Sequence, residues 1–256
     1  QVDAEPTKIG WNRAAHVGIV ADPGRFLDQL GTHKATYGRS NIAGWLGRLQ
    51  SSEAEKLAAA DALADSADAD GAVHPERFGR DVAAFFGPDA IVAVDGGDIV
   101  STTAKWLQVS HPGHVLDPGP FGTLGTGPGY ALAAKVVHPD KEVGIVFGDG
   151  GFGFHGMEYD TYLRHGLSII GVVGNDGVWN NIKTFHRAFY PDRLVATDLG
   201  VRPYHAMVSG LGGHGNFVRK ASKLLPALEE ARDSKMPALV NVHLQETFRA
   251  SSNYSQ

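Results

Sequence analysis

The sequence contains no cysteine among its 256 residues. This absence excludes disulfide bonds, thiolate metal sites and a cysteine nucleophile. It is compatible with a reducing compartment, and we predict a cytoplasmic protein.

The sequence also lacks the features of two partner classes. It carries a net charge of −5 and no basic run, so nothing indicates a nucleic-acid partner. No apolar stretch approaches the roughly 20 residues that span a bilayer, and residues 1–10 lack a secretory-signal pattern. We therefore expect no nucleic acid and no membrane as partners. The chain also begins without methionine, on a stretch that resembles a strand, and this predicts a piece of a longer polypeptide.

Strand-like and helix-like segments alternate from residue 73 onward. The strands are solidly apolar, and the first helix repeats Phe78, Val82 and Phe85 at helical spacing. We predict strands at 90–95, 142–147, 167–173 and 237–244, and helices at 74–86, 99–109, 126–137 and 156–165. This alternation is typical of an α/β fold with a doubly wound parallel sheet covered on both faces.

The chain divides into three parts by composition. Residues 1–33 have the pattern strand, turn, strand and short helix, as at the end of an α/β unit. Residues 34–72 are predicted to form a linker, although the Ala- and Asp-rich stretch 51–71 fits a solvated helix equally well. Residues 73–256 form the main domain with a polar C-terminal tail.

Two of the predicted strands end in an acid flanked by glycine. One runs into Gly148-Asp149-Gly150, and the other into Asn175-Asp176 between two glycines. Parallel strands bring their carboxyl ends to one edge of the sheet, where ligands bind. Glycines at such turns let backbone N–H groups approach an anion, and oxygen ligands suit Mg²⁺. The pattern therefore predicts two ligands for one divalent ion, which in turn holds a diphosphate.

The order of these elements resembles the thiamine diphosphate motif, in which GDG is followed after about 24 to 27 residues by two asparagines. Here 24 residues separate Gly150 from Asn175. The upstream stretch GPFGTLGTGPGYALAAK is similar to the pyrimidine-cradling segment of the acetolactate synthase and oxalyl-CoA decarboxylase superfamily. The resemblance implies that 73–256 is the pyrophosphate-binding domain, that 1–33 ends a middle domain, and that the cofactors are thiamine diphosphate and Mg²⁺.

The resemblance assigns metal ligands residue by residue. It implies Asp149 as the first ligand, Asp176 as the second and the Val178 carbonyl as the third. Asn175 is the alternative second ligand if the loop is one residue shorter. The family has asparagine where this chain has Asp176, so the site carries one more negative charge.

The resemblance also implies the groups that hold the organic cofactor. Leu124 is expected to wedge thiamine into a bent shape, and the Gly122 carbonyl to accept from its 4'-amino group. Trp179 is expected to face the substrate, and His155 is either a proton shuttle or only a residue near the helix start. The predicted diphosphate-binding positions lie in two loops: Gly97, Asp98, Gly148, Gly150 and Gly151.

The stretch from Gly148 to Asn181 resembles bacterial 2-hydroxyacyl-CoA lyases. These enzymes split a 2-hydroxyacyl-CoA into formyl-CoA and a ketone or aldehyde, and act in reverse as carboligases. An acetolactate synthase-like enzyme or 2-oxoacid decarboxylase is the alternative, although GTGPGYALAA and NDGVWNN depart from acetolactate synthase motifs. A non-catalytic cofactor-binding module is the alternative of another class.

The family requires a glutamate from its N-terminal pyrimidine-binding domain. No glutamate of this chain lies in a matching context. We therefore expect an N-terminal pyrimidine-binding segment or subunit as a partner, together with a homo-oligomer (dimer or tetramer) and an acyl-CoA substrate.

Overall fold

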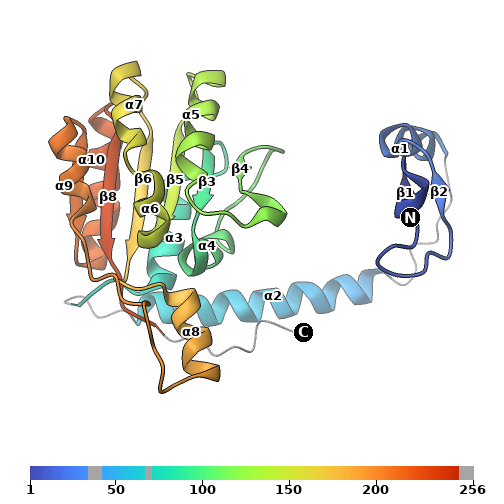
Figure 1. Cartoon of the computed structure of the whole chain (residues 1–256), viewed down its shortest axis with the longest axis horizontal. Coiled ribbons are helices and arrows are strands. Elements are labelled where there is room, and N and C mark those ends of the chain that lie inside the picture. The colour runs from blue at the N-terminus through green and yellow to red at the C-terminus, as the bar shows by residue number, and fades with distance from the viewer. Residues whose placement is uncertain (34–41, 67–70, 248–256) are drawn as a thin grey trace. The chain divides into compact units, whose positions relative to one another are not determined.

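The computed structural model describes residues 1–33, 42–66 and 71–247 (Figure 1). Contacts divide the chain into two compact units, Gln1–Ala54 and Glu55–Gln256. In the described ranges, no helix is long and apolar enough to cross a membrane. The predicted C-terminal tail lies largely outside these ranges.

The smaller unit begins with a two-stranded parallel sheet. β1 (Val2–Asp3) pairs with β2 (Ile19–Val20), and α1 (Pro23–Thr32) follows. The helix begins where the Asp22 carboxylate accepts a hydrogen bond from the Arg25 N–H at 2.9 Å, which satisfies a donor that has no partner within the helix. The start of the chain therefore has the expected order of strand, turn, strand and short helix.

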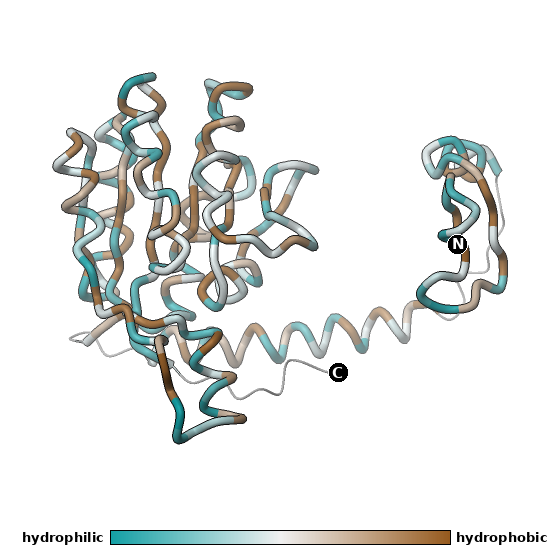
Figure 2. The backbone as a smooth tube through the Cα atoms, viewed as in Figure 1, coloured by the Kyte–Doolittle hydropathy of each residue, from teal (hydrophilic) through white to brown (hydrophobic). Residues whose placement is uncertain are grey.

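The helix α2 (Ile42–Asp65) occupies most of the segment predicted as a linker. For the stretch 51–71 the composition fitted a linker and a helix equally well, and the residues up to Asp65 form a helix. Apolar and polar stretches alternate along it (Figure 2). Its last turns are held by Arg80, whose guanidinium lies 2.8 Å from the carboxylates of Asp61 and Asp65. The rest of the predicted linker lies outside the described residues, at 34–41 and 67–70.

The larger unit is built on a six-stranded sheet in which every neighbouring pair is parallel. The spatial order is β4-β3-β5-β6-β8-β7. The strands are β3 (Ile91–Asp95), β4 (Val115–Leu116), β5 (Val143–Gly148), β6 (Ile170–Asn175), β7 (His214–Val218) and β8 (Ala238–His243). The predicted α/β fold with a doubly wound parallel sheet is confirmed.

Helices cover both faces of this sheet (Figure 1). One face packs against α3, α4 and α10, and the other against α5, α6, α7 and α9. Their bounds, with α8 beyond the sheet edge, are α3 (Pro75–Phe86), α4 (Gly97–Ala104), α5 (Gly127–Val137), α6 (Asp149–His155), α7 (Glu158–His165), α8 (Asn180–Phe189), α9 (Tyr204–Leu211) and α10 (Leu224–Asp233). Short 3₁₀ helices are η1 (Pro6–Lys8), η2 (Gly119–Phe121) and η3 (Ala221–Lys223).

The strands are apolar throughout because both of their faces are buried. On β3, Val92 and Val94 belong to one core cluster, whereas Ile91 and Ala93 belong to the cluster on the opposite face. Successive side chains of a strand point to opposite faces, so each must be apolar when helices cover both. This explains the continuous apolar runs in the sequence.

The topology creates a crevice between β3 and β5. The chain runs from β3 to its neighbour β4 on one side, and then returns to β5 on the other side of β3. In open α/β sheets, ligands bind at such a switch point, beyond the carboxyl ends of the strands. Asp95, Gly148 and Asn175 are the last residues of β3, β5 and β6, and they lie at this edge.

The segment after β5 differs from its prediction. We expected a turn from Gly148 to Gly150 and a helix over 156–165, but α6 already begins at Asp149 and α7 follows at Glu158. The glycines permit this early helix because a Cβ on Gly151 would lie only 2.8 Å from the Asp95 carbonyl oxygen. Close packing of α6 against β3 therefore requires glycine, the residue type that had indicated a turn in the sequence.

Candidate functional site

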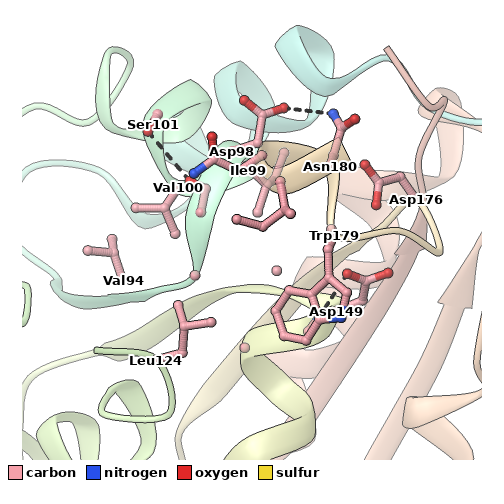
Figure 3. A pocket seen from close by; sticks show the side chains of 18 of the residues that line it. Val94, Asp98, Ile99, Val100, Ser101, Leu124, Asp149, Asp176, Trp179 and Asn180 are labelled. Atoms are coloured by element: carbon pink, nitrogen blue, oxygen red, sulfur yellow. Dashed lines mark hydrogen bonds between the residues drawn. The ribbon is translucent and has the colours of Figure 1, made fainter. Parts of the chain in front are cut away.

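A cavity of about 420 Å³ opens at the carboxyl ends of β3, β5 and β6 (Figure 3). Its size is in the range of small-molecule sites. Nearly all of the predicted site residues line it, namely Gly97, Asp98, Gly122, Leu124, Gly148, Asp149, Gly150, Gly151, Asp176, Val178 and Trp179. His155 and Asn175 are not among the lining residues. Residues from four separate loops thus meet in one place.

Asp149 joins the ends of two strands. It is the first residue of α6, is 4% exposed, and accepts hydrogen bonds from the N–H of Gly150 and from that of Gly177, each at 2.8 Å. Burial disfavours its charged form and raises the pKa of Asp149 to about 6. The carboxylate therefore fixes the loop after β6 against the start of α6.

Asp176 lies beside Asp149 at the cavity (Figure 3). Its Oδ1 accepts from the Val178 N–H at 3.2 Å. Burial, and then the charge of Asp149, raise the pKa of Asp176 to about 7. Two adjacent acids with raised pKa values form a site that a divalent cation would stabilise.

The side-chain oxygens at this cavity fit a cation whose remaining coordination positions are filled by oxygens of a bound ligand. In the part of the chain that the structure describes, no group of three or more His, Asp or Glu side chains could hold a metal ion. If a cation binds at this cavity, Asp149 and Asp176 can supply two carboxylates, and further ligands would come from backbone carbonyls or from a bound anion. Val178 lines the cavity, and its carbonyl also accepts from the Asn180 N–H at 2.9 Å.

Asn175 belongs to a buried network on the sheet side of the loop. Its amide donates to the Arg202 carbonyl at 2.9 Å and to Asn241 Oδ1 at 3.0 Å, while its own Oδ1 has no hydrogen-bond partner. Asn241 also donates to the Arg202 carbonyl, at 2.8 Å. Asn175 thus faces the sheet side of the loop, whereas Asp176 lines the cavity. Asn241 was missed by the sequence analysis, where the only signal was a polar residue in the apolar strand β8.

A backbone clamp holds the loop after β6. The Gly177 carbonyl accepts from the N–H groups of Leu199 and Gly200 at 2.7 and 2.8 Å, and the Trp179 N–H donates to the Thr197 carbonyl at 2.8 Å. The nearly buried Lys183 ammonium reinforces the clamp from α8 through an ion pair with Asp198 at 2.7 Å. These residues were not singled out in the sequence, because no local pattern marks a stretch about 20 residues after the loop it fixes.

Trp179 lies against the first turn of α6. A Cβ on Gly150 would come within 2.2 Å of the indole ring, so only glycine permits this contact. The Phe154 ring lies 6.3 Å from the indole in an edge-on arrangement. Trp179 therefore forms a wall of the cavity next to the predicted diphosphate loop.

The remaining predicted residues lie around the rim. Leu124 lies across the cavity from Asp98 (Figure 3). Gly122 adopts the left-handed conformation, with φ of +56°, at the end of η2. The Asp98 carboxylate accepts from the Asn180 amide at 3.0 Å. His155 is exposed at the end of α6 and packs against Gly125, whose Cβ would meet its ring nitrogen.

The raised pKa values predict that the metal-free chain loses stability as pH rises. The ordinary aspartate pKa is 3.8, whereas those of Asp149 and Asp176 are about 6 and about 7. The folded state therefore holds more protons than the unfolded state in this window, and the free energy of unfolding falls as pH rises through 6 and 7. We expect a loss on the order of 3 kcal/mol between about pH 5 and 8.

Urea unfolding in the presence of a chelator measures this loss. Asp176→Asn should flatten the pH dependence, whereas Asp160→Asn, at an exposed aspartate on α7, should leave it as in the parent. The prediction would be contradicted if the unmodified protein had the same free energy of unfolding at about pH 8 as at about pH 5.

Comparison with known proteins supports the interpretation of this cavity. Residues 95–242 match the family described as thiamine pyrophosphate enzyme, C-terminal TPP binding domain. A Mycobacterium bovis protein named probable acetolactate synthase is 42% identical over 232 residues, which is 90% of this chain and 41% of the relative. The 2-hydroxyacyl-CoA lyase 2 of Caenorhabditis elegans is 35% identical over 252 residues, which is 96% of this chain and 39% of the relative.

The fold has a solved counterpart as well. The thiamine diphosphate-dependent 4-hydroxybenzoylformate decarboxylase of Rhodococcus jostii aligns with a TM-score of 0.65 and 21% identity, over 72% of this chain and 34% of the other. The chain spans about two fifths of the length of the curated relatives named above. The match of the C-terminal domain covers both strand-end acids and most of the residues that line the cavity, and the chain therefore belongs to the thiamine pyrophosphate enzyme family.

Proposed function

We propose that this chain is the cofactor-binding half of a thiamine diphosphate-dependent carbon–carbon lyase and carboligase. Its reaction is cleavage of a 2-hydroxyacyl-CoA to formyl-CoA and a ketone or aldehyde. The observation that carries the cofactor assignment is the pairing of Asp149 and Asp176 at one cavity, beside glycines that leave no room for side chains. The likeness to 2-hydroxyacyl-CoA lyase 2 over 96% of this chain supports the reaction.

Different residues of the cavity are proposed to bind different parts of the cofactor. Asp149, Asp176 and the Val178 carbonyl would hold Mg²⁺. The Gly151 N–H would face the diphosphate beside Gly150, whose own N–H donates to the Asp149 carboxylate. Magnesium prefers oxygen ligands and commonly shares them with phosphate, which fits two carboxylates without a histidine. When bound, thiamine diphosphate supplies the electron sink for breaking or forming a carbon–carbon bond.

The opposite wall orients the organic part. Leu124 would hold the thiamine in its bent shape, and the Gly122 carbonyl would accept from the 4'-amino group; both residues line the cavity. Gly97 and Gly148 line the passage to the diphosphate. Asp98 is bound to Asn180 at 3.0 Å, so its charge is directed to α8 rather than to the anion.

Two residues are proposed to act on the substrate side. Trp179 presents a flat apolar surface and restricts the acyl branch. His155 acts at the edge as a proton shuttle, in an exposed position that can exchange protons with water. The remaining partners are an N-terminal pyrimidine-binding segment or subunit, further copies of the chain in a homo-oligomer, and the acyl-CoA, in the cytoplasm.

The second candidate is acetolactate synthesis. The 42% identity to a Mycobacterium bovis protein named probable acetolactate synthase favours it. Against it, GTGPGYALAA and NDGVWNN differ from the acetolactate synthase motifs at the cofactor loops.

Separate incubations with two substrates distinguish these reactions. We expect the enzyme, assembled with its N-terminal segment, to release formyl-CoA from 2-hydroxyisobutyryl-CoA and to leave pyruvate unconsumed. Acetolactate from pyruvate without formyl-CoA from the thioester would establish the second candidate instead. Carbon dioxide from a 2-oxoacid without carboligation would indicate a decarboxylase, and binding of the cofactor without any turnover would indicate a non-catalytic module.

A further inference from the structure

Asp95 is the last residue of β3, and its buried carboxylate is not one of the proposed metal ligands. The residue is 1% exposed. Its Oδ1 accepts from the Gly125 N–H at 2.8 Å, and its Oδ2 accepts from the Gly127 N–H at 2.9 Å. Both oxygens are therefore committed to the backbone of one loop, 30 and 32 residues later in the chain.

Close packing around Asp95 makes this arrangement specific. A Cβ on Gly127 would lie 2.7 Å from the Asp95 Cβ, and a Cβ on Gly151 would lie 2.8 Å from the Asp95 carbonyl oxygen. Gly125 has a φ of +86°, which favours glycine, and its Cβ would meet the His155 ring at 2.4 Å. The end of β3 is thus enclosed between this loop and α6.

The bonded loop is the one that carries Gly122 and Leu124 into the cavity. Of the two acids proposed as metal ligands, Asp149 instead begins α6, and Asp176 directly follows β6. Asp95 therefore acts on one wall of the cavity through side-chain hydrogen bonds. It meets the other wall by packing, with its carbonyl oxygen and its Oδ1 at 2.8 and 3.1 Å from the position of a Cβ on Gly151. A buried carboxylate that loses such bonds leaves donors unsatisfied, at a cost larger than for neutral groups.

We propose that Asp95 is a positioning residue that fixes the loop bearing Gly122 and Leu124, and that it thereby determines affinity for the thiamine part of the cofactor. This rests on the proposed cofactor site. Diphosphate with Mg²⁺ binds through the acids and glycines of the other wall, so its affinity does not depend on Asp95.

The experiment compares two ligands in calorimetric titrations of the enzyme assembled with its N-terminal segment. One ligand is thiamine diphosphate with Mg²⁺, and the other is inorganic diphosphate with Mg²⁺. Asp95→Asn keeps the shape of the side chain, but its NH₂ group faces one of the two N–H donors. We expect thiamine diphosphate to bind about 10- to 100-fold more weakly and inorganic diphosphate to bind as in the parent.

The matched control is Asp81→Asn. Asp81 is 6% exposed and forms an ion pair with Arg77 on α3, away from the cavity. It should leave both affinities unchanged. Equal loss of both ligands in Asp95→Asn would indicate general damage and overturn the positioning role, as would unchanged binding of both.

Two further measurements keep the proposal testable if Asp95→Asn fails to fold. Gly127→Ala strains the contact between the loop and Asp95, because its Cβ would lie 2.7 Å from the Asp95 Cβ with no α6 atom among its three nearest neighbours, and it should also weaken thiamine diphosphate selectively. In the parent, the amide protons of Gly125 and Gly127 should exchange slowly with solvent, and fast exchange of both would overturn the proposal. A parent that binds thiamine diphosphate no more tightly than inorganic diphosphate would instead refute the proposed cofactor site, and the role of Asp95 with it.

Discussion

Asp149→Ala is expected to lower the affinity for thiamine diphosphate in the presence of Mg²⁺ by more than about 100-fold. Loss of groups that merely support a metal ligand already costs roughly 10- to 100-fold, so loss of a ligand itself should cost more. Without Asp149 no ion is held between Asp176 and the diphosphate, and the two negative groups repel each other. Titration calorimetry with Mg²⁺, and again with a chelator, measures the effect.

A second variant separates the charge of Asp149 from its hydrogen bonds. The carboxylate also accepts from the Gly177 N–H at 2.8 Å, so alanine removes a structural contact as well as a ligand. Asp149→Asn retains an acceptor and the shape of the side chain, and it should still lose most of the magnesium-dependent binding. Asp81→Asn, a comparably buried acid away from the cavity, should bind normally. Unchanged affinity in Asp149→Ala, or in the parent with chelator, would disprove the metal site.

The isolated chain is expected to leave the C2 proton of the cofactor almost unexchanged, and addition of the N-terminal segment is expected to raise the rate by about 10²- to 10⁴-fold. That range is the usual contribution of one positioned acid or base. The resemblance implies that this group is a glutamate, and the cavity described here is lined by aspartates without any glutamate.

No glutamate of the described residues is among those that line the cavity. Glu246 pairs with Lys183 at 3.0 Å, Glu229 with Arg232 at 3.0 Å, and Glu158 begins α7 outside the cavity lining. Proton–deuterium exchange at C2, followed by magnetic resonance, measures the rate. An N-terminal segment whose glutamate is replaced by glutamine is the control and should restore little. Exchange at a catalytic rate from the isolated chain would contradict the expectation.

Several features followed from the sequence because they depend on local pattern. Apolar runs such as 167–173 predicted buried parallel strands, since a strand covered on both faces has no polar side. The acids at Asp149 and Asp176 were predicted to meet because each directly follows a strand, and parallel strands end at the same edge. The helices α6 and α7 and the strand β6 fill the interval between them, and β5 and β6 are neighbours in the sheet.

Other features depended on the tertiary structure. The sequence does not state that β8 lies between β6 and β7, and this order brings Asn241 to Asn175. Nor does the sequence state that the loop 197–200 holds Gly177 by hydrogen bonds between backbone groups. Such bonds do not depend on side-chain type, so the sequence does not indicate them.

The role of Asp95 shows the same division most clearly. The sequence placed Asp95 at the end of a predicted strand, shortly before Gly97 and Asp98, which were expected to contact the diphosphate. Only the folded chain places the N–H groups of Gly125 and Gly127 against its two oxygens. Local periodicity determines which segments become strands and helices, whereas the partners of a buried polar group are set by which segments the sheet order brings together.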